Sequence, residues 1–145
     1  MPRSPVCVDA NIVVKLLVPE PERPLALALW EKWLHEDREI VAPYLFSFEV
    51  TSAIWRKVQR HLMTVEEARE AIRGALALGV RLLHPPNISL RAFDLAARFN
   101  HPAAYDAHYL ALAEMVQGEF WTADERLYNA VRKDFPDIRW LGNYR

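Results

Sequence analysis

The sequence predicts an α/β fold in which a parallel β-sheet carries helices on both faces. Short apolar runs alternate along the chain with longer segments whose apolar residues recur at helical spacing. Strands that alternate with helices in this way form parallel sheets, because each helix returns the chain to the same edge of the sheet. At 145 residues with 52% hydrophobic content, the chain is expected to form a single domain over residues 1–145.

The expected strands are short runs rich in β-branched and other apolar residues. In chain order they are Pro5–Val8, Glu39–Ala42, Val80–Leu83, Glu119–Thr122 and Ile138–Leu141. Short, almost continuously apolar runs are typical of strands that are buried on both faces. Pro85 and Pro86 end the third run, since proline cannot donate to a strand ladder.

The expected helices lie between these strands. In chain order they are Ala10–Leu17, Leu25–His35, Pro43 to about His61, Thr64 to about Leu78, Ser89–Phe99, Tyr105–Gln117 and Asp124–Lys133. Prolines at positions 19, 21 and 24 separate the first two helices. Thr64 and Glu67 match a capping box at the start of the fourth helix, and His101-Pro102 precedes the sixth.

Acidic residues occur where an α/β fold binds its ligands, outside the carboxyl ends of the strands. Asp9 directly follows the first strand, and Asp124 follows the fourth. Glu49 stands in an otherwise uncharged run, and Asp106 lies in the first turn of a largely apolar helix. Such positions are unusual for acids, because burying an unpaired carboxylate costs free energy.

If these four acids converge, they predict a divalent metal site. Neighbouring carboxylates repel one another and raise one another's pKa values unless a cation neutralises them. Carboxylate and water oxygens suit Mg²⁺ or Mn²⁺, and such an ion can activate water and clamp a phosphate. Because no His or Cys cage accompanies the acids, phosphodiester hydrolysis fits this pattern better than zinc chemistry does.

Each acid also has a structural interpretation that spacing alone leaves open. Asp9 could cap the helix that begins at Ala10. Asp106 could be a solvated acid favoured by the helix dipole, and Glu49 could pair with Arg56 or another basic residue.

Asp124 has a structural alternative of its own. Thr122 and Glu125 match the Thr-x-x-Glu pattern of a capping box, in which the threonine hydroxyl caps the next helix. Asp124 would then be a surface residue with no part in the site.

At these residues the sequence resembles PIN-domain ribonucleases of the VapC toxin type. The motifs that carry the resemblance are Val6–Asn11, Phe48–Val50, Tyr105–Ala113 and Phe120–Leu127. Each motif is weak alone, but the series covers nearly the whole chain in the order of that family.

The resemblance implies a PIN-like three-layer sandwich with a parallel sheet of about five strands. It also implies an endoribonuclease that depends on Mg²⁺ or Mn²⁺. The acidic pocket carries over onto Asp9, Glu49, Asp106 and Asp124, with Asp9, Asp106 and Asp124 as the metal-binding residues, directly or through water. Thr122 is expected to orient Asp124 or a water. Asn11 departs from the serine or threonine common in relatives, although its amide can still form hydrogen bonds in the pocket.

The VapC-type resemblance further implies a toxin of a type II toxin–antitoxin system. Such chains are small homodimers that a cognate VapB-like antitoxin holds inactive, often by bringing a basic side chain to the acidic pocket. Arg56, Lys57 and Arg60 are candidates for RNA or antitoxin contact, although a solvated helix end explains them equally well. With no long apolar span and no signal-peptide core, we expect a cytoplasmic protein without membrane contact.

Two rival functions remain open at the level of sequence. In a phosphatase of the haloacid-dehalogenase type, Asp9 would be the nucleophile, but the second acid that such enzymes need is replaced by Asn11. A non-catalytic PIN-like module that binds metal or RNA is the other rival. The formal net charge of −1 does not by itself indicate a nucleic-acid binder.

Overall fold

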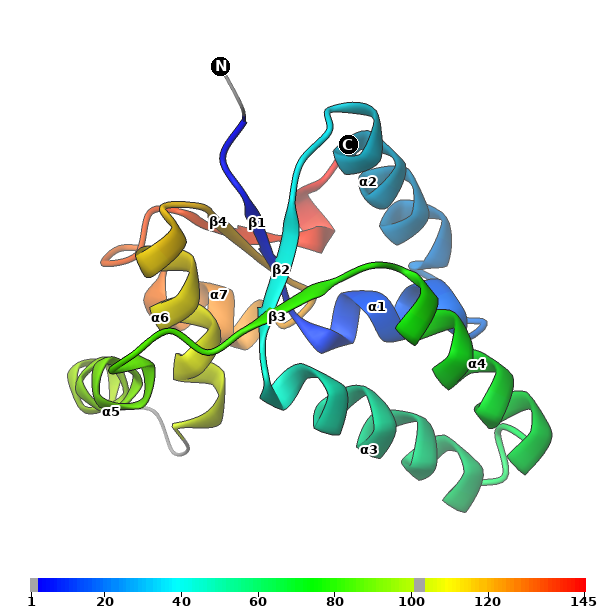
Figure 1. Ribbon diagram of the computed structural model, residues 1–145. Helices are drawn as coiled ribbons and strands as arrows, with labels where there is room; N and C mark the ends of the chain where they lie inside the picture. Colours follow the sequence, from blue (N-terminus) through cyan, green and yellow to red (C-terminus); the bar gives the residue numbers. More distant parts are fainter. Residues whose placement is uncertain (1–2, 101–103) are drawn as a thin grey trace.

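A computed structural model describes residues 3–100 and 104–145 of the chain (Figure 1). Its centre is a five-stranded sheet in the order β3-β2-β1-β4-β5, and every neighbouring pair of strands is parallel. The strands are β1 (Val6–Val8), β2 (Ile40–Pro43), β3 (Arg81–Leu83), β4 (Glu119–Thr122) and β5 (Ile138–Trp140). The predicted fold class, with its parallel sheet of about five strands, is confirmed.

The helices lie between consecutive strands and cover the two faces of the sheet. They are α1 (Ala10–Leu17), α2 (Arg23–His35), α3 (Leu45–Gln59), α4 (Val65–Ala77), α5 (Ile88–Phe99), α6 (Tyr105–Val116) and α7 (Glu125–Val131). Helices α1 to α4 lie on one side of the sheet and α5 to α7 on the other (Figure 1). The result is the predicted arrangement of helix, sheet and helix layers.

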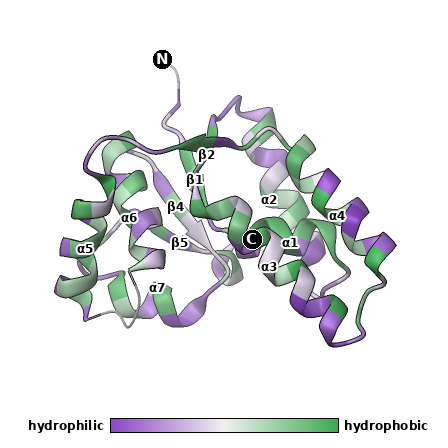
Figure 2. Ribbon diagram, turned by 60° about the horizontal axis from the view of Figure 1, so that its bottom comes forward, coloured by the Kyte–Doolittle hydropathy of each residue, from purple (hydrophilic) through white to green (hydrophobic). Residues whose placement is uncertain are grey.

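Strand β1 occupies the middle of the sheet and is the most deeply buried element. Val6, Cys7 and Val8 are all fully buried, as expected for a central parallel strand covered on both faces. Burial also raises the pKa of the Cys7 thiol, which supports its interpretation as an inert core residue. Figure 2 shows the same pattern along the chain: β1 and β2 are hydrophobic, whereas α4 alternates between hydrophobic and hydrophilic residues.

The order of strands reverses at β1. The chain runs from β1 to β2 and β3 on one side, and then crosses back to β4 and β5 on the other side of β1. The carboxyl ends of β1 and β4 therefore lie next to each other at the point where the helical connections diverge. In open α/β sheets, this point is where ligands bind.

Most predicted boundaries hold to within a few residues, and the capping box of α4 is confirmed. The Thr64 hydroxyl accepts from Glu67 N at 3.1 Å, and Thr64 N donates to Glu67 Oε1 at 2.9 Å. The prediction that Pro43 begins a helix is wrong. Pro43 is the last residue of β2 and pairs with Leu83, and α3 begins at Leu45. The predicted break at His101-Pro102 lies outside the described residues.

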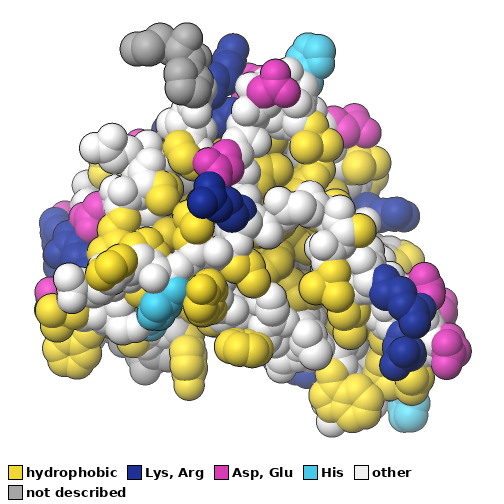
Figure 3. All heavy atoms as spheres, in the orientation of Figure 1, with side chains coloured by type: hydrophobic (Ala, Val, Ile, Leu, Met, Phe, Trp, Pro, Cys, Tyr) yellow, Lys and Arg dark blue, Asp and Glu magenta, His cyan; other side chains and the backbone are white. Residues whose placement is uncertain are grey.

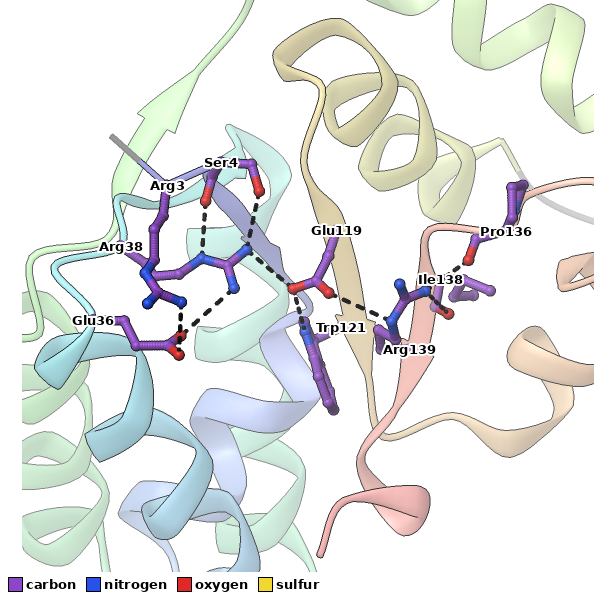
Figure 4. Close-up of polar contacts among 9 residues, drawn as sticks. All are labelled: Arg3, Ser4, Glu36, Arg38, Glu119, Trp121, Pro136, Ile138 and Arg139. Atoms are coloured by element: carbon purple, nitrogen blue, oxygen red, sulfur yellow. Dashed lines mark hydrogen bonds and ion pairs between the residues drawn. The ribbon is translucent and has the colours of Figure 1, made fainter. Parts of the chain in front are cut away.

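The amino-terminal edge of the sheet is closed by ion pairs (Figure 4). Glu119 Oε1 accepts from Arg38 Nη2 at 3.0 Å and from Trp121 Nε1 at 3.3 Å, and Arg139 Nε lies 3.4 Å from Glu119 Oε2. Arg38 also donates to the backbone oxygen of Ser4, just before β1. Two guanidinium groups thus neutralise Glu119. Their contacts connect the residues at the starts of β1 and β4 with β5.

In the described part of the chain, no helix combines the length and the hydropathy needed to cross a membrane.

Candidate active site at the carboxyl ends of β1 and β4

Asp9 and Thr122 meet because β1 and β4 are adjacent and in register. Val8 pairs with Trp121, and Asp9 N donates to Trp121 O at 3.0 Å. This register sets the residue after β1 beside the last residue of β4. The strand ends that were predicted to carry the site therefore do lie side by side.

The Asp9 carboxylate is buried, and both of its oxygens accept hydrogen bonds. Asp9 is only 7% exposed. Its Oδ2 accepts from the Thr122 hydroxyl at 2.9 Å, and its Oδ1 accepts from Asn11 N at 3.3 Å. The second bond caps α1, so the structural interpretation of Asp9 as a helix cap is correct. Capping leaves lone pairs on both oxygens, and it fixes the direction in which the carboxylate points.

Asn11 and Thr122 connect the two strand ends. Asn11 Nδ2 donates to the Thr122 hydroxyl at 3.3 Å, and Asn11 Oδ1 accepts from Ala123 N at 3.0 Å. The fully buried Thr122 hydroxyl also accepts from Asp124 N at 3.0 Å. A serine or threonine at position 11 could not both donate and accept across this distance as an amide does, which gives Asn11 a clear structural use.

Glu49 is held by a buried tyrosine from another helix. The hydroxyl of Tyr109, in α6, donates to Glu49 Oε1, in α3, at 2.6 Å. Tyr109 is fully buried, and its ring stacks on Phe120 with 5.4 Å between centroids. This rigid donor was not recognised in the sequence, because Tyr109 reads there as one more apolar residue of α6.

The acids at this edge shift one another's pKa values. Burial raises the pKa of Asp9 to about 7, with a smaller contribution from repulsion by Glu49 and a minor one from Asp106. The hydrogen bonds from Thr122 and Asn11 act in the opposite direction and favour the ionised carboxylate. Asp9, Glu49 and Asp106 therefore form a single electrostatic cluster, although 97 residues separate the first from the last in the sequence.

The pKa of Glu49 is also raised above its ordinary value. Burial raises its pKa and repulsion by Asp106 raises it further, whereas the Tyr109 hydroxyl and the more distant Arg56 lower it. Within the described residues neither Asp9 nor Glu49 forms an ion pair, so the predicted pairing of Glu49 with Arg56 is not a direct contact. The edge thus contrasts with the opposite one, where Glu119 has two cationic partners.

Asp106 and Asp124 approach this edge from the starts of α6 and α7. Asp106 lies half-buried in the first turn of α6. Asp124 is itself the cap of α7, with its Oδ1 accepting from Leu127 N at 3.1 Å. The alternative in which Thr122 caps this helix is wrong, because Asp124 is the cap residue and the Thr122 hydroxyl oxygen accepts from Asp124 N and Asn11 Nδ2. Asp124 is linked to Asp9 through that hydroxyl.

The donor chemistry of this edge fits a divalent cation held partly by water. Among residues 3–100 and 104–145, no three His, Cys, Asp or Glu side chains lie together as a ready set of metal ligands. Mg²⁺, however, usually keeps several waters and takes only one or two protein carboxylates. The buried Asp9 carboxylate, which has acidic neighbours and no cationic partner in the described part of the chain, provides this kind of site. The assignment of Asp9, Asp106 and Asp124 as ligands stays a prediction.

The three basic residues near the end of α3 have different surroundings. Lys57 Nζ lies 2.7 Å from Glu20, which also pairs with Lys15, and the Lys57 side chain is only 21% exposed. Arg56 donates to the Ser52 hydroxyl at 3.2 Å and lines a groove beside Glu49. Arg60 is exposed at the carboxyl end of the helix. Lys57 is thus engaged in joining α3 to the loop after α1, whereas Arg56 faces a groove that is open to a ligand.

Comparisons with known proteins agree with this architecture. The family model described as PIN domain matches residues 6–133. Ribonuclease VapC3 of Pyrobaculum aerophilum is 28% identical over 122 residues, which covers 83% of this chain and 89% of that protein.

Solved structures show the same fold at low sequence identity. A toxin–antitoxin complex from Klebsiella pneumoniae has a chain with a TM-score of 0.66 at 19% identity, covering 94% of this chain and 97% of that one. VapC20 of Mycobacterium tuberculosis, described as a sarcin–ricin loop cleaving toxin, has a TM-score of 0.67 at 16% identity, covering 92% and 98%.

Proposed function

The chain belongs to the PIN-domain family, and we propose on this basis that it is an endoribonuclease that requires Mg²⁺ or Mn²⁺. The observation that carries the proposal is the acidic cluster at the carboxyl ends of β1 and β4. Asp9, Glu49 and Asp106 repel one another there, and the Asp9 pKa rises to about 7. An arrangement that costs stability without a cation is best explained by a site built to bind one.

Each side chain has a defined task in this proposal. Asp9 and Asp106 would bind the cation, with Asp124 reaching it through water. The chemistry that a divalent cation supplies at such a site is activation of water and neutralisation of the phosphate charge. Glu49, whose pKa is raised by burial, is suited to take a proton from the attacking water. Thr122 and Asn11 fix the Asp9 carboxylate, and Tyr109 fixes that of Glu49.

The biological role that we propose is that of the toxin in a toxin–antitoxin pair. Support comes from the similarity to Ribonuclease VapC3 and from a fold shared with a chain of a toxin–antitoxin complex. We propose a VapB-like antitoxin that presents a basic side chain to the acidic cluster, a homodimeric toxin, and action on RNA in the cytoplasm. The lack of an ion-pair partner for Asp9 and Glu49 in the described residues supports this choice of inhibitor.

The proposal is tested by incubating the purified protein with a structured RNA in Mg²⁺, in Mn²⁺ and in chelator. We expect cleavage only with metal, and a loss of about 100-fold or more in Asp9→Asn and Glu49→Gln. Glu125→Gln, at an exposed acid on α7, is the matched control and should cleave normally. Equal cleavage by all variants would reveal a contaminating nuclease and reject the proposal. Metal binding without cleavage would favour a regulatory module, and a trapped phosphoenzyme would favour the phosphatase.

A further inference from the structure

A groove lies directly beside Glu49, between α3 and the start of α6. It has a volume of about 290 Å³ and is lined by Leu45, Phe48, Glu49, Ser52, Arg56 and Tyr105. Since Glu49 belongs to both, the groove opens from the acidic cluster itself. Any RNA strand positioned for cleavage at that cluster would pass this groove.

Two aromatic side chains from different helices stand exposed in the groove. Phe48 of α3 is 73% exposed and Tyr105 of α6 is 69% exposed. Large aromatic rings are normally buried, and exposed ones mark contact surfaces when they gather around a hollow. Figure 3 shows exposed hydrophobic side chains along the lower edge of the molecule in that view, over α3 and α5.

The described lining of the groove also includes the basic side chain of Arg56. The Arg56 guanidinium donates to the Ser52 hydroxyl one turn earlier on α3, and both residues line the groove. A guanidinium beside exposed aromatic rings is a combination that binds single-stranded nucleic acid. The rings stack on bases, and the cation contacts a phosphate.

We propose that this groove binds one unpaired nucleotide of the RNA next to the phosphate that is cleaved. The base lies against Phe48 and Tyr105, and its phosphate contacts Arg56. Bases within a duplex are already stacked on one another, so the base that enters this groove has to be unpaired. This inference rests on the proposed ribonuclease function and extends it by assigning Phe48, Tyr105 and Arg56 to substrate binding.

The charges in the groove favour a nucleotide over an apolar protein segment. An apolar partner would desolvate Glu49 and Arg56 without pairing either of them. Another groove, between α3 and α4, is lined mainly by apolar side chains and is better suited to such a partner. Its lining includes Ile54, Trp55 and Val58.

The test measures binding of a labelled single-stranded RNA of about ten nucleotides by fluorescence anisotropy. All proteins carry Asp9→Asn, which prevents cleavage, and are assayed with Mg²⁺. We expect Phe48→Ala and Tyr105→Ala each to weaken binding by roughly tenfold, and Phe48→Trp to retain it. Phe93→Ala removes a similarly exposed ring, 66% exposed on α5, and should bind RNA like the protein that carries only Asp9→Asn. A duplex of the same sequence should bind weakly to all of them.

Cleavage by the same variants with Asp9 restored separates failure of this inference from failure of the proposed function. If wild-type protein cleaves RNA but Phe48→Ala and Tyr105→Ala bind it as tightly as Phe93→Ala, the groove assignment is wrong and the nuclease proposal stands. If light scattering shows that these two variants change the oligomeric state while RNA affinity is unchanged, the groove is a protein interface and the inference is rejected. If wild-type protein neither binds nor cleaves RNA, both proposals fail.

Discussion

The Thr122 hydroxyl donates a hydrogen bond of 2.9 Å to Asp9 Oδ2, although 113 residues separate the two in the chain. The same oxygen accepts from Asn11 Nδ2 and from Asp124 N. One buried hydroxyl thus connects the end of β1, the end of β4 and the first turns of α1 and α7. Because Thr122 is fully buried, solvent cannot readily replace this hydroxyl as a partner, and its loss should affect both stability and the site.

Replacing Thr122 by valine keeps the shape of the side chain but removes all three hydrogen bonds. We expect the free energy of unfolding to fall by about 1–3 kcal/mol, because Asp9 and Asn11 are left with unmet bonds. Cleavage should fall as well, since the Asp9 carboxylate loses the donor that orients it. The matched control is Thr51→Val, because the Thr51 hydroxyl bonds only to Ser47 O on an exposed face. Urea unfolding and cleavage rates check both expectations, and equal behaviour of the two variants would contradict them.

Asp9 should make the stability of the metal-free protein depend on pH. Its pKa is about 7 in the folded protein and 3.8 for the ordinary carboxyl group, so between these values the folded state binds the extra proton. Stability should therefore be highest at the acidic end of this window and fall by up to about 1.4 kcal/mol per pH unit as pH rises through it. Above the Asp9 pKa of the folded protein, this contribution to stability is fully lost, and Asp9 no longer makes stability change with pH.

Asp9→Asn removes this titration and serves as the comparison. The variant should be less sensitive to pH than the wild type over the same window, and more stable than the wild type above about pH 7. Denaturant unfolding at several pH values, in chelator, measures both curves. Parallel curves for the two proteins would show that Asp9 does not carry a raised pKa.

Removal of the Tyr109 hydroxyl should shift the pH dependence of cleavage. Its bond to Glu49 lowers the Glu49 pKa, so Tyr109→Phe should raise that pKa and move the acidic limb of the pH–rate profile to higher pH. It should also cost about 1–3 kcal/mol of stability, because the acceptor is charged. Tyr128→Phe is the control, since the Tyr128 hydroxyl forms no hydrogen bond among the described residues. An unchanged profile with a lowered melting temperature would leave Tyr109 a purely structural role.

The salt dependence of RNA binding should show that Arg56 contacts an RNA phosphate and that Lys57 does not. Arg56→Met should lower the slope of log affinity against log salt by about 0.7, the value for one phosphate contact on a single strand. Lys57→Met should leave the slope unchanged and lower stability instead, because Lys57 pairs with the partly buried Glu20. If Lys57→Met changes the slope and Arg56→Met does not, the assignment of the groove cation is wrong.

Much of the fold could be predicted because its signals are local. The segments Ala10–Leu17 and Glu119–Thr122 form a helix and a strand with the predicted bounds. Each is a largely apolar segment next to residues that break the pattern, Asp9 and Pro19 for the helix and Gly118 and Asp124 for the strand. The prediction that Pro43 begins a helix was wrong because proline is common at the first position of helices. Here it ends β2 beyond the part that pairs with β1, where a missing N–H costs little.

The candidate site could be predicted only in part, because its contacts are tertiary. The strand-end rule located Asp9 and the segment that contains Asp124. The hydrogen bond from Tyr109 to Glu49 joins residues of two helices that are 60 positions apart in the chain, and no local sequence pattern predicts it. Thr122 resembled a helix cap in the sequence, but the register of β1 and β4 turns its hydroxyl toward Asp9.

The most direct test of the acidic cluster is a titration of the protein with Mn²⁺, followed by electron paramagnetic resonance of the free ion. Wild-type protein should bind Mn²⁺, Asp9→Asn and Asp106→Asn should lose that binding, and Glu125→Gln should retain it. If wild-type protein leaves all Mn²⁺ free, or if the Asp9 and Asp106 variants bind it as the wild type does, the cluster does not hold a divalent cation.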